Sequence, residues 1–103
     1  MIKVSVFYPN GAGTKFDITY YVKKHMPMVQ KLLGSSLKGM AVEQGISGGQ
    51  AGSAPTYVAM GHLLFNSVGE YEKSFAPHAQ AIVGDVPNYT NSQPLIQISE
   101  VQL

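Results

Sequence analysis

The sequence predicts one α+β domain in which two helices pack on one face of a four-stranded antiparallel sheet. Three observations support this fold class. The chain has 103 residues, which is the size of a single domain. Four segments have the alternating or β-branched character of strands, and two longer segments carry apolar residues at helical spacing. Glycine-, proline- and asparagine-rich segments separate them in the order β-α-β-β-α-β.

The first predicted strand is Ile2–Tyr8, because apolar residues alternate with other residues along it. Turn-forming residues at 9–11 end this strand. Asp17 is placed to cap the following helix, since its carboxylate can accept the free N–H groups of the first turn. The domain therefore begins with a strand that leads through a polar loop into a helix.

Apolar residues at helical spacing predict a first helix that runs from Ile18 to a stop at Gly34. Pro27 lies inside this pattern. It has no N–H to donate to the carbonyl of Lys23, and its ring crowds that turn. We therefore expect a kink or break at Lys24–Met26.

Strand-like composition predicts a second strand at Leu37–Gln44 and a third at Thr56–Phe65. The glycine-rich segment Gly45–Pro55 joins them, and we expect it to be a mobile loop. A phosphate-binding role is disfavoured, because this segment lacks the Gly-Lys-Ser/Thr ending of a P-loop.

Ser67 can cap the second helix, with Glu70 in the position of a capping box. Pro77 interrupts this helix, a turn-rich exit follows at residues 85–91, and Pro94–Leu103 is the last predicted strand. Two right-handed β-α-β crossovers with both helices on one face of the sheet give a ferredoxin-like βαββαβ sandwich.

The third and fourth predicted strands are apolar on both faces, although one sheet face of a two-layer monomer would contact water. We therefore expect a second copy of the chain to cover that face in a homodimer. The residues on the two faces of the third strand are Tyr57, Leu63 and Phe65 on one and Val58, Met60 and Leu64 on the other.

Composition excludes several functional classes. The chain has no cysteine, which rules out disulfides and a cysteine nucleophile. The net charge is +1, and the one basic cluster, Lys23, Lys24 and Lys31, fits a solvated helix face better than a nucleic-acid surface. No apolar stretch is long enough to cross a membrane, and no signal peptide is recognisable, so we expect a cytoplasmic protein.

Three segments resemble the EthD family: Tyr8-Pro9, the motif FDITYYVKKHMPMV at residues 16–29, and DVPNYT at residues 85–90. The resemblance spans nearly the whole chain and implies a single EthD-like domain at residues 1–103. It also implies a dimeric α/β barrel with a pocket between the helices and sheet of each subunit. The family takes its name from the degradation of ethyl tert-butyl ether, in which the member accompanies an oxidising enzyme. The wider superfamily includes cofactor-independent monooxygenases, haem-binding proteins and lactone isomerases.

His25 and Tyr21 are the candidate catalytic residues. His25 lies on the apolar stripe of the first helix, just before the break expected at Pro27, where an imidazole could act as general acid or base. The alternative is a structural histidine bonded to a carbonyl at the kink. Tyr21 lies one turn earlier on the same face, where it could bind a carbonyl or phenolate or could pack in the core.

Tyr8, Tyr20, Met28 and His62 are the further residues that we assign to the ligand pocket, with Tyr20 at its periphery. His62 shares a strand face with Met60, and the sequence does not decide whether that face meets the pocket or the partner sheet. The histidines lack the spacing of metal ligands, so we expect neither a metal nor a cofactor.

The predicted function is the binding of a small hydrophobic or aromatic compound in a degradative or biosynthetic pathway. Two hypotheses remain open. One is a cofactor-independent monooxygenase or isomerase with His25 as base and Tyr21 as orienting group. The other is a non-catalytic accessory protein for a partner oxidising enzyme. Haem binding through a histidine is a third, weaker hypothesis, which absorbance near the Soret band would test.

Overall fold

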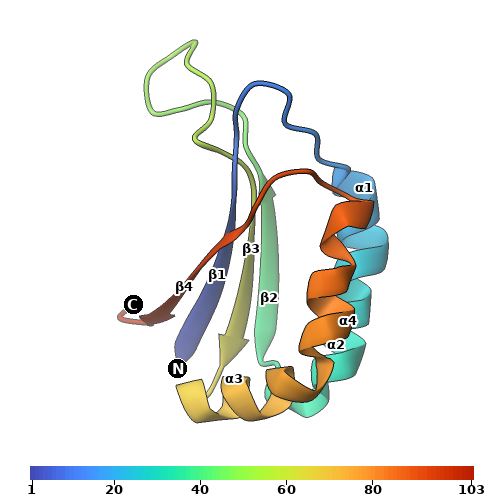
Figure 1. The fold of residues 1–103 in the computed structure, drawn as a ribbon. Coiled ribbons are helices and arrows are strands. Elements are labelled where there is room, and N and C mark those ends of the chain that lie inside the picture. Colours follow the sequence, from blue (N-terminus) through green and yellow to red (C-terminus); the bar gives the residue numbers. More distant parts are fainter.

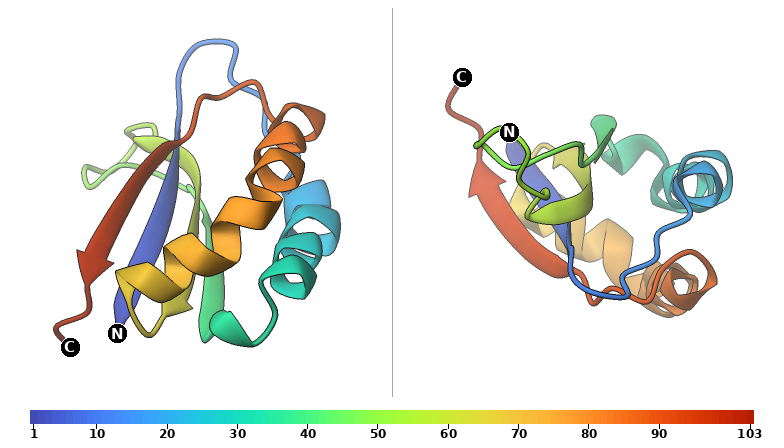
Figure 2. Two further views of the ribbon diagram at one scale, coloured as in Figure 1. Left: turned by 60° about the horizontal axis from the view of Figure 1, so that its bottom comes forward. Right: turned by 90° about the horizontal axis from the view of Figure 1, so that it is seen from above.

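A computed structural model describes all residues, 1–103, as a four-stranded antiparallel sheet in the order β2-β3-β1-β4 (Figure 1). Seen from above, the helices gather on one side of this sheet (Figure 2). The architecture is the ferredoxin-like α+β sandwich, and the predicted fold class is confirmed. The strands are β1 (Ile2–Pro9), β2 (Gly39–Gln44), β3 (Tyr57–Phe65) and β4 (Leu95–Glu100).

The central strand β1 pairs with β3 on one side and β4 on the other. The last strand is shorter than the predicted Pro94–Leu103 segment for a physical reason. Pro94 has no N–H for the ladder. At the other end, Val101 still donates to the carbonyl of Met1, but no residue of β1 remains to pair with Gln102 and Leu103.

The first helix is continuous and consists of α1 (Ile18–Tyr20), the π-helical turn η1 (Tyr21–His25) and α2 (Met26–Leu33). The Asp17 carboxylate accepts the N–H of Tyr20 at 3.0 Å, so the predicted N-terminal cap is confirmed. The disturbance expected at Pro27 takes the form of the π turn, in which the N–H of Met26 donates to the carbonyl of Tyr21. Such wide turns absorb an irregularity in the α-helical ladder without ending the helix.

The second helix consists of α3 (Val68–Phe75), the 3₁₀ turn η3 (Ala76–His78) and α4 (Ala79–Gly84). Ser67 caps it by accepting the N–H of Glu70 at 3.1 Å. The helix changes direction at η3, where Pro77 interrupts the ladder, so that α3 runs along the lower edge of the fold and α4 turns up beside α2 (Figure 1). A further 3₁₀ turn, η4 (Val86–Asn88), leads back towards β4.

The two sheet faces differ in what covers them. The helix-facing side carries buried residues of the core, including Val4, Ala59 and Phe65, and α2 packs on it through Val29 and Leu33. No helix covers the opposite side, which we call the outer face (Figure 2). Half-buried apolar side chains of β1 and β3 occupy this outer face, as the alternation of the strands predicts. They are Phe7, Tyr57, Met60 and Leu64. A β-bulge opposite Tyr8 and Pro9 shifts the register at the start of β3, so Tyr57 contacts Phe7 on the outer face and Val58 packs against the core, the reverse of the faces predicted for these two residues.

The loop at residues 45–56 extends from the end of the sheet beyond β2 and β3 (Figure 1). Gly45 is required at its start, because a Cβ atom there would overlap the carbonyl oxygen of Tyr57. No helix in the structure has the length and apolar character needed to span a bilayer.

Candidate functional site

A cavity of about 280 Å³ lies between the helix-facing side of the sheet and the two helices. Of the 17 residues that line it, 14 are hydrophobic, so the walls favour an apolar occupant. The lining residues are Val4, Val6, Tyr8, Tyr21, His25, Met26, Val29, Gly61, Leu63, Tyr71, Phe75, Ile82, Val83, Val86, Tyr89, Pro94 and Ile96.

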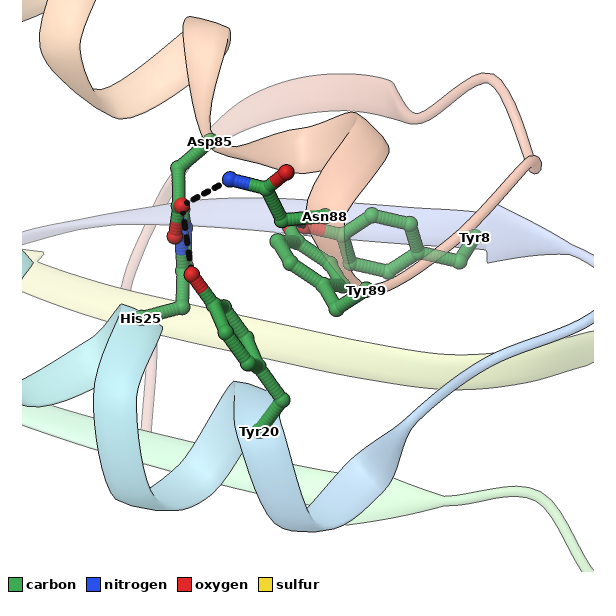
Figure 3. A network of polar contacts seen from close by, with 6 residues as sticks. All are labelled: Tyr8, Tyr20, His25, Asp85, Asn88 and Tyr89. Carbon is green, nitrogen blue, oxygen red and sulfur yellow. Dashed lines mark hydrogen bonds and ion pairs between the residues drawn. The ribbon is translucent and has the colours of Figure 1, made fainter.

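The π turn places His25 in the cavity wall, where the residue is only 4% exposed. Its Nδ1 atom lies 2.9 Å from Oδ2 of Asp85, which follows α4 (Figure 3). No buried side-chain nitrogen or oxygen lacks a hydrogen-bond partner. The Nε2 atom of His25 has no hydrogen-bond partner within the chain, so it is not one of these fully buried atoms. Because His25 lines the cavity, Nε2 faces the cavity.

The protonation of His25 follows from its surroundings. Desolvation by burial lowers the pKa of His25 below its ordinary value, although the hydrogen bond and the charge of Asp85 oppose this effect. The ring is therefore neutral at pH 7. An ionised carboxylate only accepts hydrogen bonds, so the Nδ1–H group donates to Asp85. The Nε2 lone pair is left to face the cavity as a base.

Three donors hold the Asp85 carboxylate. Oδ1 accepts from the Tyr20 hydroxyl at 2.8 Å and from Nδ2 of Asn88 at 2.9 Å, and Oδ2 accepts from His25 (Figure 3). Desolvation raises the pKa of Asp85, but the hydrogen bonds from Asn88, His25 and Tyr20 outweigh it and lower the pKa below its ordinary value. The carboxylate is thus ionised and fixed, which fixes the orientation of the His25 ring.

Tyrosine side chains supply the other polar atoms of the cavity. The ring of Tyr21 stacks on that of His25, with centroids 5.4 Å apart and planes at 15°. Gly61 makes room for the Tyr21 hydroxyl, because a Cβ atom at this position would overlap it. The hydroxyls of Tyr8 and Tyr89 are hydrogen-bonded at 2.7 Å. Desolvation raises the pKa of Tyr8, Tyr21 and Tyr89, so all three remain neutral phenols that can donate hydrogen bonds.

The structure brings only part of the predicted site together. Tyr8, Tyr21 and His25 line the cavity. Tyr20 does not line it, and its hydroxyl donates to Asp85 instead. Met28 does not line the cavity, because consecutive residues of a helix point in different directions and its neighbour Val29 faces inwards. Met28 packs at the edge of the core.

His62 also lies away from the cavity, and its placement in the pocket is wrong. Its neighbours Gly61 and Leu63 face the cavity, so strand alternation turns His62 to the outer face. There Nδ1 lies 2.9 Å from Oγ of Ser5, and Nε2 lies 2.8 Å from Oε1 of Glu43.

Sequence reasoning missed Asp85, Asn88 and Tyr89 as site residues. All three belong to the DVPNYT segment, which supports the family resemblance and forms the exit from the second helix. Asp85 is 60 positions from His25 in the chain, so no local spacing reports the pair. No group of three or more histidine, aspartate or glutamate side chains is arranged to hold a metal ion.

The fold and the cavity define a ferredoxin-like protein whose sheet and helices enclose an apolar cavity with an aspartate-supported histidine. The family model for the EthD domain matches residues 11–93, and the chain belongs to the EthD family. No curated protein matches the chain in sequence.

Solved structures agree with this assignment. An EthD-like protein from Ralstonia eutropha is 41% identical with a TM-score of 0.95, over 99% of this chain and 92% of that chain. An ethyl tert-butyl ether degradation (EthD) family protein from Bacillus halodurans is 17% identical with a TM-score of 0.74, over 99% of each chain. A dabb family protein with a ferredoxin-like fold from Mesorhizobium loti is 11% identical with a TM-score of 0.60, over 98% of this chain and 96% of that chain. The latter two show the fold alone.

Proposed function

We propose that the cavity binds a small hydrophobic or aromatic molecule and that Nε2 of His25 removes a proton from it. One observation carries this proposal: the unpartnered nitrogen of a neutral imidazole, held by Asp85, faces an apolar cavity. A base in this setting acts on an acidic C–H bond next to a carbonyl, or on a phenol.

The chemistry is a proton transfer. The C–H bond breaks and its proton moves to Nε2 of His25. Its electron pair forms the new C=C bond, and the π pair of the C=O bond moves onto the carbonyl oxygen. Asp85 stabilises the imidazolium that forms, and the Tyr21 hydroxyl can donate a hydrogen bond to the enolate oxygen. Return of the proton to a different carbon gives an isomer. Attack of the carbanion on dioxygen would instead begin an oxygenation.

The proposal is tested with 2-tetralone, an apolar bicyclic ketone with acidic C–H bonds. In heavy water, NMR follows the replacement of these hydrogens by deuterium. We expect the protein to accelerate the exchange and the His25→Asn variant to lose about 10²-fold or more of this acceleration. His62→Asn is the matched control, because His62 lies on the outer face. Binding without accelerated exchange would favour the accessory role, and no binding would refute the proposal.

We also propose a homodimer in which a second copy covers the outer face of the sheet. Half-buried Phe7, Met60 and Leu64 form its centre, and Leu95 at its margin is 55% exposed. A stable interface of this kind buries roughly 1,200 Å² or more in total. Sedimentation should show a dimer that Met60→Glu dissociates. Ile46→Glu, in a loop position that is 93% exposed, is the control.

A further inference from the structure

A second depression adjoins the cavity. We call it the outer groove; it is distinct from the outer face of the sheet. It has a volume of about 390 Å³ and lies between η4, the end of α4 and the segment that leads to β4. Val83, Val86 and Pro94 line both the cavity and the outer groove, so the two spaces lie side by side with these residues between them. Val83 is 58% exposed, which places this junction at the surface. A ligand longer than the cavity would therefore extend into the outer groove.

The outer groove differs from the cavity in its chemistry. Only two of its eight lining residues are hydrophobic, and none of them is charged. The other six are Pro87, Thr90, Asn91, Ser92, Gln93 and Pro94. The groove therefore favours a group that is polar and neutral, since its lining offers no opposite charge to an ionic group.

Most polar side chains of the outer groove already bind their own chain. Asn91 accepts the N–H of Lys15 at 2.8 Å and donates to the carbonyl of Gly13 at 2.9 Å. Ser92 donates to the carbonyl of Pro9 at 2.8 Å. Gln93 is the exception, because neither its side-chain amide nor its main-chain N–H has a partner within the chain. Its donors are available for a carbonyl, ether or hydroxyl oxygen of a ligand.

We propose that the natural ligand has two parts: an apolar, aromatic body that fills the cavity at His25, and a neutral oxygen-bearing tail that Gln93 binds in the outer groove. The inference rests on the proposed function, which assigns the cavity to the aromatic body. It adds a second binding element and restricts the ligand to elongated molecules with polarity at one end. Gln93 then selects among ligands without touching the reacting atoms.

Fluorescence titrations with a ligand series test this inference. 2-Naphthol, the aromatic analogue of the enol of 2-tetralone, represents the body alone. Its 6-carboxamide derivatives, with no, one or two methylene groups before the amide, add a neutral tail of increasing reach, and the 6-carboxylate adds a charged one. The protein variants are Gln93→Leu and a matched control, Gln50→Leu, which alters the same residue type in the exposed loop at residues 45–56.

We expect at least one amide to bind about fivefold more tightly than 2-naphthol, which corresponds to one net hydrogen bond. Gln93→Leu should remove this gain and leave the affinity for 2-naphthol unchanged, and Gln50→Leu should preserve both. No gain from any amide, a gain that survives in Gln93→Leu, or a larger gain from the carboxylate would each overturn the inference while the proposed function stands. Failure of 2-naphthol itself to bind would refute both.

Discussion

Replacing Asp85 with asparagine tests whether Asp85 determines which ring nitrogen of His25 carries the proton. The two carboxylate oxygens have separate partners: Oδ1 accepts from Tyr20 and Asn88, and Oδ2 accepts from His25. The asparagine oxygen would keep the first two donors, so its NH₂ group would face Nδ1 of His25. That nitrogen would then have to accept, and the ring proton would move to Nε2. The base would lose the lone pair that faces the cavity.

The expected effects are large and of two kinds. The exchange of 2-tetralone should slow by about 10²-fold or more, because Nε2 no longer accepts a proton. The side chain of Asp85 is 15% exposed, and in the variant its three charge-assisted hydrogen bonds become neutral ones, which should cost about 2 kcal/mol of folding free energy. For a domain of this size, that cost lowers the melting temperature by roughly 10 °C.

The assay is deuterium exchange measured on Asp85→Asn at a temperature where thermal melting shows the variant to be folded. Glu43→Gln is the matched control, since it removes the carboxylate that contacts a different histidine, the half-buried His62 on the outer face. The control should retain full exchange activity. An Asp85→Asn protein that is folded and exchanges 2-tetralone at the normal rate would refute the role of Asp85 in holding the His25 tautomer.

Three further predictions address the site and the loop. Gly61→Ala should lower stability by about 1–3 kcal/mol through overlap with the Tyr21 hydroxyl, and Tyr21→Phe in the same chain should restore much of it in thermal melts. The pKa of His25 is lowered from 6.5, and the base acts when unprotonated, so the exchange rate should rise with pH and reach half its maximum below pH 6.5. A midpoint above 6.5 would contradict the burial argument. Deletion within residues 47–53, which keeps Gly45, should leave the melting temperature and 2-naphthol affinity nearly unchanged, and a large drop in either would show that the loop is packed.

The features that the sequence predicts well are local ones. Asp17 and Ser67 cap their helices because each needs only the N–H groups of the next turn. Strand alternation likewise shows which residues share a face. It does not say which face the helices cover, and for this reason the sequence groups His62 with Met60 without deciding whether the two face the pocket or the outer side of the sheet.

The site itself depends on contacts between distant segments. The position of Asp85 beside His25 results from the way the end of α4 packs against the π turn. The sequence of neither segment predicts this contact. Pro27 reveals that the first helix is irregular near His25, but a proline is compatible with a kink, a break or a wide turn. Sequence therefore located the region of the site while missing the carboxylate that orients it.

The π turn determines how the site would respond to a change in the length of the first helix. In an α-helix, consecutive side chains point about 100° apart, so an inserted or deleted residue rotates everything beyond it. A wide turn holds one additional residue locally, and here Tyr21 and His25 on one side and Met26 and Val29 on the other all reach the same cavity. Loss of one residue from Lys23–Lys24 would restore a regular α-helix and turn His25 relative to Tyr21. The stacking of the His25 and Tyr21 rings would change, while the apolar seam of α2, which begins directly after His25, stayed in register with the sheet.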